Sequence, residues 1–274
     1  MTIRTLRRLP WLLAAVAAAA LTVRAQTGGP PKRNIAGPGD YALRERIVGL
    51  LGRDPDLSRE KYGVVLVNGG VILSGQIKNC ALKMRALRIA ASIRGVINVT
   101  DEMRVAPADL PDESLRQAVQ GALQNKAEEI GLQGLSATVA DGVATIEGTV
   151  KDFAARVRGE EIAGSILGIT RVSNHLFPAG VPAGTDDPSL VKAAVGYLGD
   201  YRNFPYPAEI LVKAGGGVVT LNGRVNLFIG RQQAGVLASL IKGVARVDNR
   251  LRVDPSLPGM AALGSTVTVV KAQP

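Results

Sequence analysis

The sequence predicts an α+β protein built from three tandem small α/β sandwich units. Each unit reads helix, strand, strand, helix, strand (αββαβ), with a three-stranded mixed sheet and two helices. Three observations predict this: glycines that recur at fixed offsets, apolar residues at helical spacing on both sides of a two-strand segment, and a tight-turn signal between those two strands. One Cys in 274 residues excludes an internal disulfide framework, and 46% hydrophobic residues exclude wholesale disorder.

The glycine pattern is the strongest repeat signal. Two glycines lie six residues apart in each copy, and a third follows the second by 20 residues. These structural repeat glycines are Gly69, Gly75 and Gly95, then Gly142, Gly148 and Gly168, then Gly217, Gly223 and Gly243. An Asp precedes the first glycine of each copy by 29 or 30 residues, at Asp40, Asp112 and Asp187. The units are therefore residues 40–106, 112–178 and 187–253.

Each segment of the unit has its own signal. The Asp is expected to be a helix N-cap, and Leu43, Ile47 and Leu50 follow it at helical spacing. Asn68-Gly69 is typical of a hairpin turn between two apolar strands. Ile89, Ala90 and Ile93 predict the apolar face of a second helix, which Gly95 ends as a C-terminal cap. A last strand is expected at 99–105.

The ends of the chain differ from the repeats. Residues 1–25 have Arg4, Arg7 and Arg8, then an apolar run, which predicts a cleaved secretory signal peptide; an uncleaved membrane anchor or twin-arginine export are the alternatives. Residues 26–39 read as a flexible leader rich in Gly and Pro. The tail, 254–274, contains an alternating stretch at 265–270. It could add to a sheet edge, but we expect it to stay loose.

Charge is distributed unevenly along the chain. The 33 basic and 23 acidic residues give a net charge of +10. The signal segment contributes +4, and the three units contribute +4, −3 and +5. Two basic units therefore flank an acidic one. This pattern favours weak binding to an anionic membrane surface, with ordinary surface charge as the alternative. Export and the acidic middle unit argue against a nucleic-acid partner.

The repeated unit resembles a known family, the BON domain. The resemblance rests on the Asn/Asp-Gly-Val hairpin with its following Gly, the Ile-x-Gly-Val/Ile helix end, and the Asn-x-Leu pattern of Asn174–Leu176 and Asn249–Leu251. The first copy has Asp101-Glu-Met103 instead. The resemblance covers about 200 residues and implies the same αββαβ fold. It also implies a non-enzymatic role in exported osmotic-stress and outer-membrane maintenance proteins, binding phospholipid membranes or other envelope components.

Residues with catalytic chemistry are few. His175, the only His, is expected on the solvent side of a strand. Cys80 aligns with Phe153 and Phe228, which predicts an apolar slot; a reactive thiol or an intermolecular disulfide is the alternative. The glycines at 215–217 predict a hairpin turn rather than a phosphate cradle. Adjacent acidic pairs at 128–129 and 160–161 are expected on solvated helix faces. We therefore predict no catalytic residues, no metal ligands and no cofactor.

The third unit contains an aromatic segment that the other two lack. Its candidate contact residues for a lipid or a protein partner are Tyr197, Tyr201, Arg202, Phe204 and Tyr206. Aromatic rings suit the membrane interface and protein hot spots, and ordinary packing of the loop is the third alternative.

The leading hypothesis is an exported, non-catalytic envelope protein, periplasmic or peripheral to the outer membrane. It would bind anionic phospholipid and support envelope integrity or stress tolerance. A periplasmic protein-interaction or chaperone-like module is the alternative. In both cases the partners would be an anionic phospholipid surface or envelope proteins.

Overall fold

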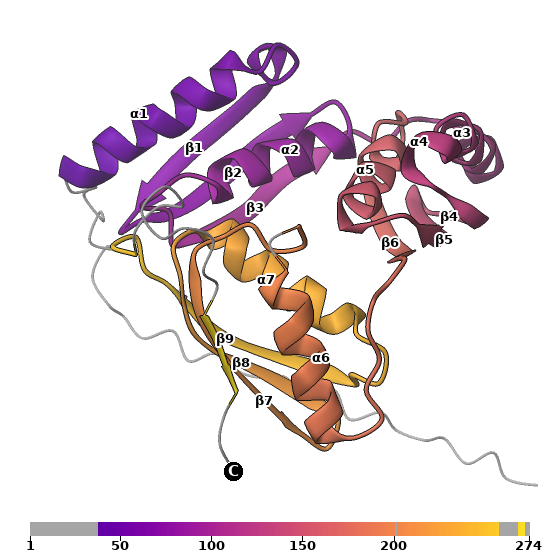
Figure 1. Ribbon diagram of the computed structural model, residues 1–274. Helices are drawn as coiled ribbons and strands as arrows, with labels where there is room; N and C mark the ends of the chain where they lie inside the picture. Colours follow the sequence, from indigo (N-terminus) through magenta and orange to yellow (C-terminus); the bar gives the residue numbers. More distant parts are fainter. Residues whose placement is uncertain (1–37, 201, 258–267, 272–274) are drawn as a thin grey trace, which may run out of the picture. The chain divides into compact units, whose positions relative to one another are not determined.

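The computed structural model describes residues 38–200, 202–257 and 268–271 (Figure 1). The expected signal peptide lies outside the described residues, as does nearly all of the leader. Within residues 38–257 the chain folds three times into the predicted αββαβ unit. The first two repeats each add a short helical turn between the first helix and the first strand.

The helices and strands of the three repeats correspond one to one. The first repeat has α1 (Pro38–Arg53), a 3-10 turn η1 (Leu57–Arg59), β1 (Lys61–Val67), β2 (Gly70–Ile77), α2 (Cys80–Ala91) and β3 (Asn98–Val105). The second has α3 (Asp112–Gln124), α4 (Ala127–Ile130), β4 (Gln133–Ala140), β5 (Val143–Val150), α5 (Phe153–Gly164) and β6 (Arg171–Pro178). The third has α6 (Asp187–Gly199), β7 (Ala208–Gly215), β8 (Val218–Val225), α7 (Phe228–Leu240) and β9 (Arg246–Val253).

Each sheet is mixed, as the sequence predicts. The hairpin strands β1 and β2 pair antiparallel, and β3 runs parallel to β2; the other two repeats do the same. The third sheet has one more strand, β10 (Thr268–Lys271), which pairs parallel with β7. The expectation that the tail stays loose is therefore wrong for residues 268–271. An alternating stretch supplies the backbone geometry that an open sheet edge can pair with.

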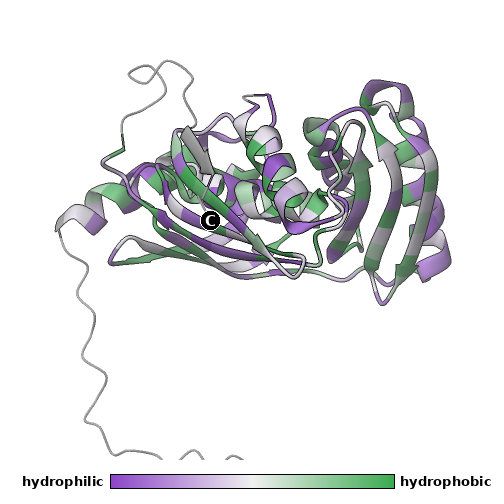
Figure 2. Cartoon of the chain, turned by 60° about the horizontal axis from the view of Figure 1, so that its bottom comes forward, coloured by the Kyte–Doolittle hydropathy of each residue, from purple (hydrophilic) through white to green (hydrophobic). Residues whose placement is uncertain are grey.

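The two long helices of each repeat cover one face of its sheet, and no helix of the described residues covers the other face, which we call the open face (Figure 1). Hydrophilic and hydrophobic residues alternate along the strands, so each sheet turns an apolar face to its helices (Figure 2). Each repeat has a core of its own. In α1 the core residues are Ile47 and Leu51. Leu50 is 39% exposed, so the predicted core position at Leu50 is wrong by one residue.

The aspartate that marks the start of each repeat ties the first helix to the hairpin. The Asp112 carboxylate accepts hydrogen bonds from the backbone N–H groups of Asp141 (2.8 Å) and Gly142 (3.2 Å). Asp40 and Asp187 make the same pair of bonds with their own hairpins. The predicted N-cap role is wrong: Pro111 and Asp186 occupy the N-cap positions of α3 and α6. A carboxylate in the first turn of the helix can satisfy two turn amides that no strand reaches.

The repeat glycines permit this geometry. Gly69, Gly142 and Gly217 have φ between 70° and 75°, in the left-handed region that hairpin turns of this kind require. The second glycine of each copy sits in a strand where backbone passes close by. At Gly148, for example, a Cβ atom would lie 2.9 Å from the Gln133 carbonyl oxygen. The six-residue spacing of the two glycines therefore follows from two constraints in one hairpin: the positive φ at its turn and the close backbone approach in its second strand.

Replacing Asp112 with Ala should destabilise the second repeat by about 2 kcal/mol, because two turn amides lose a charged acceptor. Denaturant unfolding measures the loss, and hydrogen exchange at the Asp141 and Gly142 amides localises it. Asp109→Ala is the matched control, since this exposed linker carboxylate makes no hydrogen bond to the hairpin. If both substitutions lower the free energy of unfolding equally, the hydrogen bonds from the hairpin amides to Asp112 do not stabilise the repeat.

Candidate interaction surfaces

The only histidine lies on the open sheet face of the second repeat. His175 is exposed on β6, as predicted, and its Nε2 atom lies 2.9 Å from the Ser173 hydroxyl. Among the described residues, no group of three or more His, Cys, Asp or Glu side chains is placed to hold a metal ion. In the same part of the chain, no helix is both long and apolar enough to cross a bilayer.

The slot shared by Cys80, Phe153 and Phe228 is the first residue of each second helix. Cys80 is 3% exposed and Phe228 is 6% exposed, so the slot takes apolar side chains as predicted. Burial raises the pKa of the Cys80 thiol, although Lys83 lies near enough to lower it. A protonated, enclosed thiol is a poor nucleophile. Cys80 therefore acts as a small hydrophobic residue in this fold.

These three residues also join the repeats in cyclic order. Cys80 forms a hydrogen bond with the Val172 backbone, and Val172 packs against the first repeat's core. Phe153 of the second repeat packs against the core of the third repeat. Phe228 of the third repeat belongs to the core cluster of the first. One position of the repeat thus makes the contact between repeats three times, each time with the next repeat.

A cavity of about 440 Å³ lies where α2, α5 and α7 approach one another. We call the three helices around it the helix junction. Equivalent helix positions supply different side chains to it: Met84, Val157 and Gln232 at one level, and Arg88, Glu161 and Val236 at the next. The repeats have therefore diverged where they meet, while the backbone arrangement within each repeat is the same.

An ion pair crosses the junction between the first two repeats. The Arg88 guanidinium lies 2.6 Å from the Glu161 carboxylate, and their side chains are only 32% and 23% exposed. The expectation of a solvated face for the acidic pair 160–161 is wrong here, because Glu160 accepts a hydrogen bond from the Asn174 amide and Glu161 binds Arg88. Sequence periodicity within one repeat could not reveal a partner 73 residues away.

The aromatic segment of the third repeat is mostly core. Phe204 is fully buried and Tyr197 is 8% exposed, and the Phe204 and Tyr206 rings stack edge to face at 5.4 Å. Arg202 is exposed and is held by the Asp200 carboxylate at 2.8 Å. Tyr201 lies outside the described residues. Loop packing, the third alternative, therefore accounts for Phe204, and of the described candidate contacts only Arg202 is exposed.

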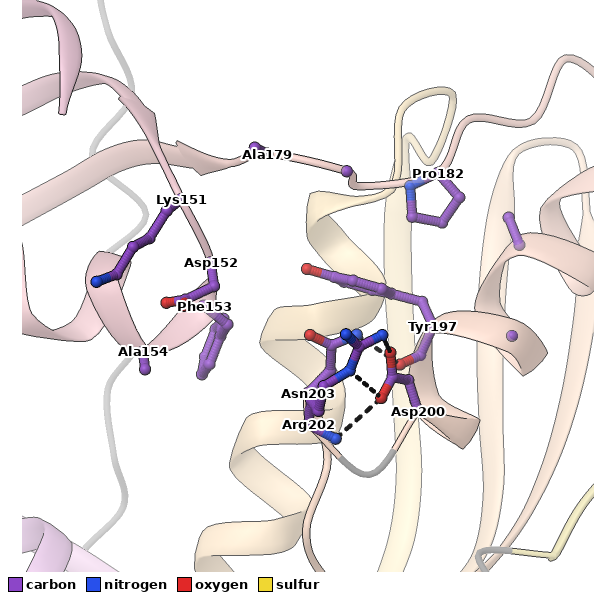
Figure 3. Close-up of a pocket in the computed structure, with 13 residues that line it drawn as sticks. Lys151, Asp152, Phe153, Ala154, Ala179, Pro182, Tyr197, Asp200, Arg202 and Asn203 are labelled. Atoms are coloured by element: carbon purple, nitrogen blue, oxygen red, sulfur yellow. Dashed lines mark hydrogen bonds and ion pairs between the residues drawn. The ribbon is translucent and has the colours of Figure 1, made fainter. Parts of the chain in front are cut away.

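A cleft of about 630 Å³ lies beside this segment (Figure 3). Figure 3 shows the Tyr197 ring extending toward Phe153, with Arg202 bound to Asp200 below it in this view. Its charged lining residues are Lys151, Asp152, Asp200 and Arg202. These charges cancel, and Asp152 is already used as the N-cap of α5. The cleft therefore offers no net charge with which to select an ionic partner.

The open sheet face of the third repeat has more basic than acidic residues. Sheet register places alternate residues of β7, β8 and β9 on this face, away from the helices. Its basic residues are Lys213, Arg224, Arg246, Arg250 and Arg252, all exposed, and its acidic residues are Glu209 and Asp248. We call these residues the basic sheet face.

Three cations of the basic sheet face form no ion pair with any described residue. Arg224 pairs with Glu209 and Asp254, and Arg250 pairs with Asp248 at 2.7 Å, which raises the pKa of both arginines. Lys213, Arg246 and Arg252 are left to interact with solvent. A flat surface with unneutralised cations attracts an anionic surface.

The same positions in the other repeats are mostly uncharged. Where the third repeat has Lys213 and Arg224, the second has Thr138 and Thr149, and the first has Val65 and Gln76. On the last strand, Arg246, Arg250 and Arg252 correspond to Arg171, His175 and Phe177, and to Asn98, Glu102 and Arg104. The excess of basic residues is therefore specific to the third repeat and is not needed for the fold.

The architecture is that of a tandem-repeat protein, with three equal scaffolds whose surfaces differ. The BON domain model matches the chain three times, at residues 39–107, 111–176 and 190–255. These matches cover well over half of the chain, which belongs to the BON domain family. BON domains are binding domains associated with proteins of the cell envelope and of osmotic stress. No curated protein matches the sequence.

Solved structures that are similar to the chain include two of one secretion-system protein. One is CdsD, a structural protein of the Type III secretion system of Chlamydia trachomatis, with 16% identity over 78% of this chain and 91% of that chain and a TM-score of 0.22. The other is the C-terminal domain of CdsD from the same organism, with 18% identity over 81% of this chain and all of that chain and a TM-score of 0.23. At these scores the likeness supports no conclusion about function.

Charge reversal at the Arg88–Glu161 pair should reveal coupling between the first two repeats. Arg88→Glu and Glu161→Arg each place like charges together at the junction, and the double substitution restores an opposite pair. We expect a coupling free energy of about 1 kcal/mol in a double-mutant cycle of denaturant unfolding. Additive single effects would show that the ion pair contributes nothing to the junction.

Proposed function

We propose that this chain is an exported, non-catalytic binding protein of the bacterial envelope that associates with anionic phospholipid membranes and supports envelope integrity or stress tolerance. Membership of the BON family and the predicted signal segment support the envelope setting. The observation that carries the lipid proposal is the basic sheet face of the third repeat, where Lys213, Arg246 and Arg252 lack acidic partners among the described residues.

The physical basis is a flat electrostatic contact. Each Lys or Arg near an anionic bilayer contributes roughly 1 kcal/mol, and an open sheet face brings several cations to one plane. The contact needs no pocket and no catalytic group. Since exposed charges are screened over about 8 Å at physiological ionic strength, the binding should weaken as salt is added. The first repeat, with a net charge of +4, adds a weaker attraction.

Co-sedimentation of the full chain with phosphatidylglycerol vesicles tests the proposal. The triple variant Lys213→Gln, Arg246→Gln, Arg252→Gln removes the three unpaired cations and should bind about 100-fold more weakly at low salt, because it loses roughly 3 kcal/mol of attraction. Arg46→Gln, Arg53→Gln, Arg59→Gln is the matched control, since it removes the same charge from exposed positions of the first repeat. Its binding should fall far less.

Each outcome has a defined meaning. If both triple variants lose binding equally, net charge rather than the basic sheet face is responsible, and the location is wrong. If the unaltered chain binds neither anionic nor neutral vesicles at low salt, the lipid proposal is wrong. Suppressed aggregation of an unfolded client without vesicle binding would favour the alternative, a periplasmic protein-interaction or chaperone-like module.

A further inference from the structure

The helix junction contains two charged side chains that form no ion pair with any described residue. Arg156 and Glu160 both belong to α5, both line the cavity of about 440 Å³, and both are half-buried. The other charged residues of the cavity wall, Arg88 and Glu161, already form an ion pair with each other at 2.6 Å. The wall therefore has one cation and one anion left over, so the cavity is neutral as a whole but has two separate points of charge.

Arg156 has hydrogen-bond donors that the fold does not use. Its Nη2 atom donates a hydrogen bond to the Asn174 carbonyl oxygen at 2.6 Å, while its Nε atom is enclosed and has no partner among the described residues. Burial lowers the pKa of the guanidinium, and the Glu160 carboxylate opposes this shift. An arginine stays charged in a protein, and a charge that loses water without gaining a partner is costly. An oxyanion in the cavity would supply the missing acceptor.

Glu160 has spare acceptor capacity beside it. Its Oε2 atom accepts a hydrogen bond from the Asn174 side-chain amide at 3.2 Å, and a carboxylate can accept several more. Residues four apart on a helix are neighbours, with about 5–6 Å between their Cβ atoms. Arg156 and Glu160 can therefore reach one ligand whose oxyanion and ammonium groups lie close together.

The other two repeats lack this pair of charges at the junction. At the two equivalent positions they have Lys83 with Leu87, and Arg231 with Gly235. The Lys83 ammonium has a partner of its own, the Asp101 carboxylate at 3.1 Å, and Arg231 does not line the cavity. The same backbone therefore forms without a free cation and a free anion at these positions, so the fold does not require them.

The rest of the cavity wall suits a short apolar group. Its apolar residues include Met84 and Leu87 from α2, Val157 from α5 and Val236 from α7. Val236 is 38% exposed, so a ligand can enter from solvent without unfolding of the helices. The volume lies within the usual range of small-molecule sites, roughly 300–1,000 Å³. An apolar side chain can therefore pack between the three helices while its charged end meets α5.

We propose that the helix junction is a binding site for a small α-amino acid with an apolar side chain. The Arg156 guanidinium binds the carboxylate of the ligand, Glu160 binds its ammonium group, and the ligand side chain packs between the helices. An α-amino acid carries both charges on one carbon, so it matches two neighbouring charges of opposite sign and adds no net charge to a neutral cavity. The site lies on the helix side of the repeats, apart from the basic sheet face, and does not depend on lipid binding.

Isothermal titration calorimetry of the full chain with L-leucine tests this. We expect saturable binding of one leucine per chain. Isocaproate, which lacks the ammonium group, and isoamylamine, which lacks the carboxylate, should each bind at least about tenfold more weakly. Equal affinity for all three compounds would overturn the proposal, because the two charges would then play no part. Absence of leucine binding at millimolar concentration would overturn it as well.

Substitutions in the cavity wall locate the site. Arg156→Gln and Glu160→Gln should each weaken leucine binding by about tenfold or more, because one charge of the ligand loses its partner. Arg231→Gln is the matched control, since it removes the equivalent arginine of α7, which does not line the cavity, and it should leave the affinity unchanged. Val236→Trp should abolish binding by filling the cavity. A folded Arg156→Gln variant that binds leucine as the unaltered chain does would contradict the proposal.

A second measurement needs no substitution in α5 and applies if those variants do not fold. Nuclear magnetic resonance of the full chain with methyl-labelled methionine should show the Met84 signal shifting as leucine is added, because Met84 lines the cavity. The Met103 signal should stay in place, because Met103 is buried in the core of the first repeat and does not line the cavity. A Met84 signal that does not move, or equal shifts of both signals, would overturn the proposal.

Discussion

Each repeat depends on two hydrogen bonds that one aspartate carboxylate accepts from the backbone amides of the hairpin turn. It fixes the first helix against the strand pair, and it needs a glycine at the turn, because the amides point to the carboxylate only when the turn has positive φ. Because this contact and the core hold the repeat together, the residues on the open sheet face are not needed for the fold. The three repeats therefore share a fold and differ in surface charge, so Arg250, His175 and Glu102 can occupy equivalent positions.

Divergence also allows the repeats to meet in a defined order. The position of Cys80, Phe153 and Phe228 is apolar in every repeat, and each member packs toward the next repeat. Charge then distinguishes the contacts, because Arg88 and Glu161 are equivalent residues that became a pair. A single chain thus keeps one scaffold three times and uses the differences for contacts between repeats.

Sequence spacing was sufficient for the fold, because glycine offsets and apolar periods report local backbone constraints. Sequence spacing is insufficient for a residue whose contact partner lies far away in the sequence. Helical spacing predicts a helix cap at Asp112, whose carboxylate instead binds the Gly142 amide, and a solvated face at Glu161, which instead pairs with Arg88. The aromatic segment drew attention as a surface, yet Phe204 is buried, since composition does not tell packing from exposure. The basic sheet face needed strand register, which sets which residues share a face.

The central claim is that the third repeat's open sheet face, and not the second's, meets the membrane. Fluorescence quenching by spin-labelled lipid in phosphatidylglycerol vesicles tests it directly. A fluorophore attached at Asn222→Cys lies on the basic sheet face, and one at Glu147→Cys lies at the equivalent position of the second repeat, each in a Cys80→Ala background. The account predicts strong, salt-sensitive quenching at position 222 and little at position 147. Equal quenching at both positions, or quenching at position 147 alone, would contradict it.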